Sequence, residues 1–368
     1  MKRDLFVFAG QSNMVGAGAL PPKLPITLSD SYEYKHKPRR LGKPSGDFIN
    51  TVYPVGEFSY ADLAAAYGPD MVDEKGNSKQ ADYAKHTYFS TSMSNLKSEA
   101  DKSVYPFATF CEADAPFGAT LAPFLAQQWE QRGQASAYAH IAKGGVSIIY
   151  YMTDEMCQDY AQRITRYNEQ HGTEINPIIS TKWQMPGAAE YFFEKCKDFF
   201  EDAKKRFPED DLQNKCFFWL QGEADGGTPP IAYETKLDIF WQRLKKIGFT
   251  HFFCIRVDYF GADCIDTVMR AQENFVAHND DAYMLTRAAS FFTYPNRDES
   301  NWFVTPPGEQ YQNCRDSFFG FDNNHINEKG FYVIARQGVD NLYRVLVEKQ
   351  EPVLEEELVR SLMDVKEL

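Results

Sequence analysis

The sequence predicts an α/β fold, a three-layer α/β/α sandwich with a parallel sheet of about five strands and long loop insertions. Short apolar segments alternate along the chain with longer amphipathic segments, which is typical of a parallel sheet covered by helices on both faces. The apolar segments are apolar throughout, as expected of strands that are buried on both sides. Long stretches rich in Pro, Ser, Asp and aromatic residues interrupt the alternation, and these are the predicted insertions.

Each predicted element follows from its own residue pattern. The expected strands are residues 5–9, 137–142, 215–220, 250–256 and 282–286. The expected helices are roughly residues 118–132, 188–206, 231–247, 263–278 and 327–349. In the last of these, Phe331, Ile334, Ala335 and Leu342 recur at helical spacing.

The expected domain organisation is one elaborated domain over residues 1–350, followed by an acidic amphipathic helix over 351–368. The insertions are residues 21–112, 146–187 and 288–321, and no internal repeat or low-complexity linker divides the chain. Open parallel sheets bind ligands beyond the carboxyl ends of their strands. Insertions that follow strands are therefore expected to surround one binding site.

Composition excludes several classes of partner. The 368 residues are 43% hydrophobic and 25% charged, and the formal net charge is −13. Such an acidic surface repels phosphate backbones and anionic lipid, so we expect neither nucleic acid nor membrane as a partner. The chain enters its first strand without an apolar leader, which predicts a cytoplasmic location, or a secreted one if a leader has been removed. Its seven cysteines form no CxxC pair, which predicts reduced thiols and no metal site; the oligomeric state is not predicted.

Two small-residue stretches are expected at the carboxyl edge of the sheet. Ser12 follows the first strand, where a serine can present both its hydroxyl and its backbone N–H to one ligand atom. Gly144 and Gly145 follow the second strand, and glycines allow a backbone N–H to approach a ligand closely. Each stretch alone also fits an ordinary turn.

A polar stretch, FFWLQGEAD, closes the third strand. Its Gln221 can supply an amide N–H to a developing oxyanion, and Glu223 and Asp225 can orient other groups or bind sugar hydroxyls. The alternative is a capped loop that leads into the next helix.

An acid–imidazole pair lies just before the last helix. Asp322 and His325 are three positions apart, so the carboxylate can hold one imidazole nitrogen while the other takes a proton from a serine. Alternatively, Asp322 caps a turn and His325 lies idle at the surface.

Together these stretches resemble the SGNH hydrolases, in particular the branch that contains sialate O-acetylesterases and family 6 carbohydrate acetylesterases. The nucleophile block GQSN of that branch matches residues 10–13, and its W-x-Q-G-E-x-D block matches residues 219–225. Its D-x-x-H block matches residues 322–325, and its glycine block corresponds to residues 143–145. The resemblance covers the predicted sheet from end to end, but it does not cover residues 21–112.

The resemblance implies a flavodoxin-like sandwich that hydrolyses O-acetyl groups of sugars, such as acetylated xylo-oligosaccharides or sialic acids, without a cofactor or metal. It implies that Ser12 is the nucleophile, that His325 is the general base, and that the N–H groups of Ser12, Gly145 and Gln221 form the oxyanion hole. Asp322 is the favoured third member of the triad, and Glu223 is the alternative. The candidate substrate contacts are Gln11, Asn13 and Asp225.

Two other functions remain open at this stage. A carbohydrate-binding module could keep the same fold without catalysis. A nucleotide- or flavin-binding protein is disfavoured, because AGQSNMVGAG has neither P-loop nor GxGxxG spacing. Some aromatic residues of the insertions could stack on a sugar ring or could simply pack beneath the loops; they are Trp183, Tyr294, Trp302 and Tyr311.

Overall fold

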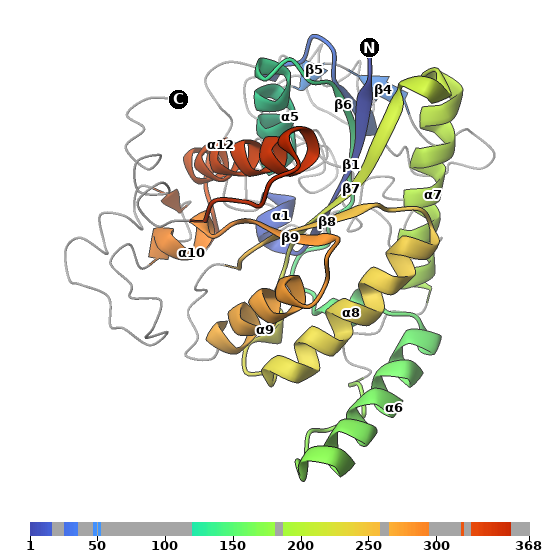
Figure 1. Ribbon diagram of the computed structural model, residues 1–368, viewed down its shortest axis with the longest axis vertical. Helices are drawn as coiled ribbons and strands as arrows, with labels where there is room; N and C mark the ends of the chain where they lie inside the picture. The colour runs from blue at the N-terminus through green and yellow to red at the C-terminus, as the bar shows by residue number, and fades with distance from the viewer. Residues whose placement is uncertain are drawn as a thin grey trace, which may run out of the picture.

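A seven-stranded sheet forms the centre of the computed structural model, which describes residues 1–16, 26–35, 47–49, 51–52, 120–180, 187–257, 265–293, 318–319 and 325–354 (Figure 1). Its strand order is β4-β3-β6-β1-β7-β8-β9. The strands are β1 (Arg3–Gly10), β3 (Tyr32–Lys35), β4 (Asp47–Ile49), β6 (Ser136–His140), β7 (Leu212–Leu220), β8 (His251–Ile255) and β9 (Ala282–Thr286). The six strands from β3 to β9 run parallel, and β4 pairs antiparallel with β3 at one edge. Two short strands, β2 (Ile26–Thr27) and β5 (Thr51–Val52), form a separate pair.

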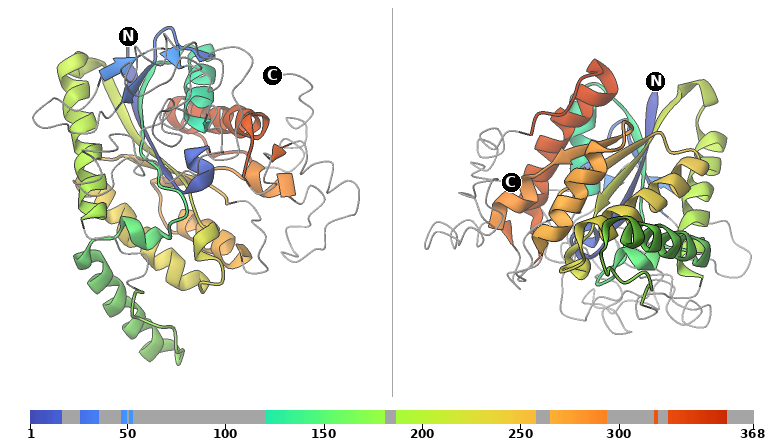
Figure 2. Two further views of the ribbon diagram at one scale, coloured as in Figure 1. Left: turned by 180° about the vertical axis from the view of Figure 1, so that it is seen from behind. Right: turned by 60° about the horizontal axis from the view of Figure 1, so that its bottom comes forward.

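Helices cover both faces of the sheet. On one face lie α5 (Leu121–Gln131), α10 (Ala288–Thr293) and α12 (Glu328–Tyr343), which continues as a π-helix over Arg344–Glu348. The other face carries α6 (Asp154–His171), α7 (Ala188–Arg206), α8 (Pro230–Lys246) and α9 (Ile265–Ala277). Figure 2 shows the sheet between α12 and α7. The remaining helical elements are short: α1 (Ser12–Val15) and the 3-10 turns Ile148–Tyr151, Glu209–Asp211 and Glu223–Asp225.

Side-chain alternation along β1 builds a core on each face. All eight residues of β1 are buried. Phe6 and Phe8 face α5 and α12, whereas Leu5 and Val7 belong to the core beneath α7 and α8. Phe8 stacks on its cross-strand partner Phe218 with the ring centres 4.5 Å apart, so the strand ends are held in register by aromatic contact.

The predicted fold class is confirmed, with one correction to the strand count. The sheet has six parallel strands rather than five, because β3 lies inside the predicted insertion 21–112 and pairs with β6. The helix predicted over 188–206 and the strand predicted over 282–286 have the observed bounds of α7 and β9.

The other insertions also contain regular structure. Residues 146–187 include the 18-residue helix α6, which begins where the Thr153 hydroxyl accepts the Met156 N–H. Residues 288–293 form α10. Of the predicted C-terminal helix, residues 351–354 are not helical and 355–368 lie outside the described residues.

Two predictions from composition can be compared with the described residues. Their four cysteines, Cys157, Cys196, Cys216 and Cys254, are not joined in disulfide bonds. None of the helices in the described part of the chain has the length and apolar character needed to cross a bilayer.

Candidate active site

The turn after β1 is held tightly against β7. Gly10 has a φ of 149°, and a Cβ at this position would overlap the carbonyl oxygen of Leu220. The next N–H, that of Gln11, donates to the same carbonyl at 3.1 Å. The short helix α1 then begins at Ser12, which is buried, with 6% of the residue exposed.

Asn13 joins the serine turn to two distant parts of the chain. Its amide nitrogen donates to Glu223 Oε1 at 2.7 Å, and its Oδ1 accepts the backbone N–H of Ile326 at 2.9 Å. These partners are 210 and 313 positions away. The neighbour of Ser12 is therefore bonded directly to the neighbour of His325.

The segment around His325 is fixed by α12. Asn327 caps that helix, because its Oδ1 accepts the Gly330 N–H at 2.9 Å. Ile326 also forms an antiparallel bridge with Phe319. His325 itself is partly buried. Asp322, the favoured third member of the triad, lies outside the described residues.

Glu223 lies close enough to His325 for the two side chains to interact electrostatically. Burial raises the pKa of the Glu223 carboxyl, while the hydrogen bond from Asn13 and the His325 imidazole lower it in part. Glu223 Oε2 is buried and has no hydrogen-bond partner among the described residues. Glu223 is thus available as the alternative acid for the imidazole.

The loop after β6 reaches the same edge. The Lys143 N–H donates to the carbonyl oxygen of Gly10 at 3.0 Å, and the Tyr151 hydroxyl donates to that oxygen at 2.5 Å. Gly145 follows with a φ of 66° and is exposed, while Val146 is buried. The left-handed conformation at Gly145 turns the loop toward the β7 side, where the Val146 carbonyl meets Gln221.

Gln221 is buried at the centre of these loops. Its Nε2 lies within hydrogen-bond distance of three oxygens, Gln11 Oε1 at 3.0 Å, Val146 O at 3.1 Å and Asp225 Oδ2 at 2.7 Å. Its Oε1 accepts the Tyr233 hydroxyl at 2.6 Å. An amide has only two N–H groups, so both are occupied by protein oxygens in this structure.

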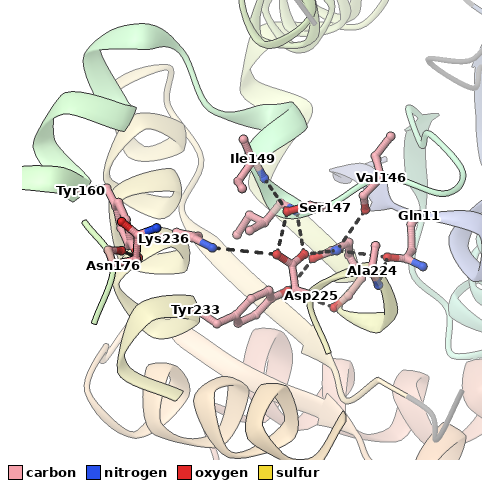
Figure 3. Close-up of polar contacts among 12 residues, drawn as sticks. Gln11, Val146, Ser147, Ile149, Tyr160, Asn176, Ala224, Asp225, Tyr233 and Lys236 are labelled. Carbon is pink, nitrogen blue, oxygen red and sulfur yellow. Dashed lines mark hydrogen bonds and ion pairs between the residues drawn. The ribbon is translucent and has the colours of Figure 1, made fainter. Parts of the chain in front are cut away.

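Gln11 differs from Gln221 in the hydrogen bonding of its amide nitrogen. Its Oε1 accepts from the backbone N–H of Ala224 at 3.2 Å as well as from Gln221. Because a backbone N–H can only donate, this bond assigns the oxygen of the Gln11 amide. Its Nε2 points away from the network (Figure 3) and makes no hydrogen bond to the described residues.

Asp225 ties the loop after β6 to the loop after β7. Its Oδ1 accepts the Ser147 hydroxyl at 2.6 Å (Figure 3). Its Oδ2 accepts the Ile148 N–H at 2.9 Å in addition to Gln221. Only 4% of the residue is exposed. These bonds give Asp225 and Asn13 bridging roles within the protein. The sequence analysis named Asp225 as a residue that could orient other groups, whereas it gave Asn13 only as a candidate substrate contact.

The structure therefore brings together the first three stretches singled out in the sequence and the described end of the fourth, through bonds among residues 10–13, 143–148, 221–225 and 326. It also adds Ser147, Tyr151 and Tyr233, which sequence reasoning missed. Ser147 stands two positions beyond the glycine pair, whereas Tyr151 and Tyr233 look like core residues and carry no local signal. The aromatic candidates Trp183, Tyr294, Trp302 and Tyr311 lie outside the described residues.

In chemical terms, the edge combines a serine at a helix start, an imidazole whose sequence neighbour is bonded to Asn13, a carboxyl group with a buried oxygen, and an exposed glycine. A serine, an imidazole and a carboxyl group are the side chains that a serine hydrolase mechanism requires. Among the described residues, no group of three or more His, Cys, Asp or Glu side chains is placed to hold a metal ion.

Comparisons with known proteins show similarity to solved structures only, and at low sequence identity. No protein-family model matches the chain, and no curated protein matches its sequence. Similar solved structures include a protein from Arabidopsis thaliana, with 12% identity and a TM-score of 0.45 over 93% of this chain and 99% of that one. They also include NanS, with 13% identity and a TM-score of 0.46 over 94% of this chain and 98% of that one.

A carbohydrate acetylesterase from Xanthomonas citri is similar at 11% identity and a TM-score of 0.43, over 94% of this chain and 57% of that one. Function on such a common type of fold depends on the site itself.

Proposed function

We propose that this protein is a serine esterase that removes O-acetyl groups from carbohydrates through an acetyl-enzyme intermediate. The observation that carries the proposal is the bridge through Asn13. It ties the turn that bears Ser12 to the segment that bears His325, across 313 positions of sequence.

In the proposed reaction, His325 takes the proton of Ser12 as the serine oxygen attacks the acetyl carbonyl. The imidazolium then returns the proton to the sugar oxygen as the carbon–oxygen bond breaks. Water, activated by the same imidazole, hydrolyses the acetyl-enzyme to acetate. Asp322 orients the imidazole in this scheme, and Glu223 is the alternative acid.

The oxyanion is stabilised by the backbone N–H groups of Ser12 and Gly145. The side-chain donor is Gln11 rather than Gln221. This assignment is supported by the bonds of the two amides, since Gln221 donates to protein oxygens whereas Gln11 Nε2 makes no such bond to the described residues. Gln221 then acts by holding Gln11 in place.

The substrate class follows from the resemblance of the four sequence blocks to carbohydrate acetylesterases. Acetylated xylo-oligosaccharides and O-acetylated sialic acids are the two proposed substrates. The proposed location is the cytoplasm, where small acetylated oligosaccharides rather than polymers would be encountered.

The experiment that tests this function is acetate release from p-nitrophenyl acetate, acetylated xylo-oligosaccharides and O-acetylated sialic acid. Wild type is compared with Ser12→Ala and with the control Ser29→Ala, whose serine is exposed and adjoins Asp30, which bonds Arg3 at the start of β1. We expect Ser12→Ala to lower kcat by at least about 10³-fold, since the nucleophile is lost, and Ser29→Ala to retain activity. Equal activity of Ser12→Ala and wild type would refute the mechanism. Sugar binding without hydrolysis in wild type would identify a binding module instead.

A further inference from the structure

A cavity lies between α6, the start of α8 and residues 174–180. Its volume is about 500 Å³. Buried residues, Ile149, Tyr160 and Lys236, form its floor, and the exposed Asn176 and half-exposed Thr228 lie at its rim. The cavity is thus large enough for a monosaccharide-sized ligand and has polar groups around its opening.

The floor carries the positive charge of Lys236, which has few negatively charged groups near it. Lys236 is 6% exposed, and its nearest acidic oxygen is Asp225 Oδ1 at 3.9 Å, which is beyond hydrogen-bond distance. That oxygen already accepts the Ser147 hydroxyl. No hydrogen bond joins Lys236 Nζ to the described residues. Burial accordingly lowers the pKa of Lys236, and Asp225 raises it only in part.

A second group contributes to the polarity of the cavity. The Tyr160 ring lies beneath the ammonium group, 5.4 Å from Nζ, and its hydroxyl donates to the carbonyl oxygen of Asn176 at 3.4 Å. Burial raises the pKa of Tyr160 to about 12, so the phenol stays neutral and adds no competing charge. Figure 3 shows Lys236 between Tyr160 and Asn176 on one side and Asp225 on the other.

These features define the chemistry of a ligand. A buried ammonium group with unused N–H donors is stabilised by an anion that supplies acceptor oxygens. One lysine matches a single negative charge, and the exposed Glu174 at the rim disfavours a dianion such as phosphate. The apolar walls, including Ile149 and Pro229, suit the C–H face of a sugar ring, while Asn176 and Thr228 can bond its hydroxyls.

We propose that this cavity binds an acidic sugar, with the sugar carboxylate on Lys236 Nζ and its hydroxyls on the rim. The site goes beyond the proposed esterase function and does not require Ser12 to be catalytic. It is nevertheless linked to the active site, because Asp225 is shared between Lys236 and the network that holds Gln221 and the loop after β6.

The test is isothermal titration calorimetry of the full chain with D-glucuronate, D-glucose and inorganic phosphate. Four proteins are compared: wild type, Lys236→Met, the same-helix control Lys246→Met, and Ser12→Ala. We expect one glucuronate site in wild type, with glucose and phosphate at least about tenfold weaker, since a lost charge-assisted bond changes affinity by that order. Lys236→Met should weaken glucuronate binding at least about tenfold, whereas Lys246→Met and Ser12→Ala should leave it unchanged.

The controls separate this proposal from the esterase function. Retained glucuronate binding in Ser12→Ala supports the cavity site whether or not Ser12 is the nucleophile. If Lys236→Met does not fold, Thr228→Val removes only a rim hydroxyl and should weaken glucuronate binding severalfold. Absence of glucuronate binding, equal binding of glucose and glucuronate, tighter binding of phosphate, or undiminished binding in a folded Lys236→Met would each overturn the proposal.

Discussion

Strands β1 and β7 and the loops that follow them are adjacent in sequence but are stabilised in different ways. Within the strands, Phe8 and Phe218 are fully buried, and they are stabilised by apolar burial and by the stacking of their rings. In the loops just beyond, Asn13, Gln221 and Asp225 are equally buried, yet each polar atom has a specific hydrogen-bond partner. The comparison teaches that the strands mainly stabilise the fold, whereas the loops position the side chains of the candidate site. Substitutions in the strands should therefore lower stability, and substitutions in the loops should lower activity.

The largest expected effect is on stability, from Phe218→Ala. Removing a fully buried ring that stacks on both Phe8 and Phe253 leaves a cavity, and such changes cost about 3–5 kcal/mol. The free energy of unfolding, measured by urea denaturation, should fall by this amount. The kcat of the folded fraction should stay near the wild-type value. Phe218→Leu is the matched control, with a smaller loss. A large drop in kcat per folded molecule would contradict the view that the strands affect stability alone.

The next effect is on catalysis, from Gln221→Ala. Without its amide, Gln11 loses a partner and the oxyanion donor loses its position, so we expect kcat to fall by about 10²–10³-fold. The global fold should survive. Initial rates on p-nitrophenyl acetate and circular dichroism measure the two quantities. The control is Gln242→Ala, a partly buried glutamine of α8 whose amide nitrogen lies 3.4 Å from Asp238 Oδ1. A kcat equal to that of wild type would remove Gln221 from the site.

Asn13→Asp tests the bridge itself. The isosteric carboxylate can still accept the Ile326 N–H, but it faces Glu223 with a like charge in place of a hydrogen bond. We expect a loss of about 1–3 kcal/mol in unfolding free energy, together with reduced kcat because His325 is displaced. Thermal denaturation and initial rates measure both quantities. Unaltered kcat would mean that the bridge does not position the histidine.

The smallest effect is a pH dependence that comes from Glu223. Burial raises its folded pKa above the ordinary value of 4.5. The folded state therefore holds this proton more tightly than the unfolded state, and the associated stability is lost as pH rises through the raised pKa. Glu223→Gln does not titrate and retains an acceptor for Asn13. Its stability relative to wild type should therefore increase from pH 4 to pH 8 in urea titrations, and parallel curves would contradict this assignment.

The sequence could predict the elements whose pattern is strong and local. α7 and β9 were predicted with their observed bounds, because each is a regular apolar pattern over its length. β3 was missed because its four residues, Tyr-Glu-Tyr-Lys, become a strand only by pairing with β6, about 100 positions away. α6 was missed because its buried residues, Met156, Tyr160 and Ile164, form only a narrow stripe on a charged helix.

The candidate site shows the same limit. The turn chemistry at Ser12, the glycine pair and the Gln-Gly-Glu stretch were visible as local signals at strand ends. The hydrogen bonds that distinguish Gln11 from Gln221 were not visible in the sequence. Either amide could supply the N–H donor, and the bond that decides between them joins residues 210 positions apart. Only the backbone N–H of Ala224 decides which end of the Gln11 amide faces inward.

Gly10 has a consequence for engineering the protein. Because the space for a side chain is taken by the Leu220 carbonyl, any other residue here must push β1 away from β7 just before Ser12 and Gln221. Variation at this position is therefore expected to remove active clones from a mutant library even when the substituted residue is small. If β7 were exchanged for a strand from another protein, the new strand would have to place a backbone carbonyl opposite Gly10, where the Leu220 carbonyl lies now.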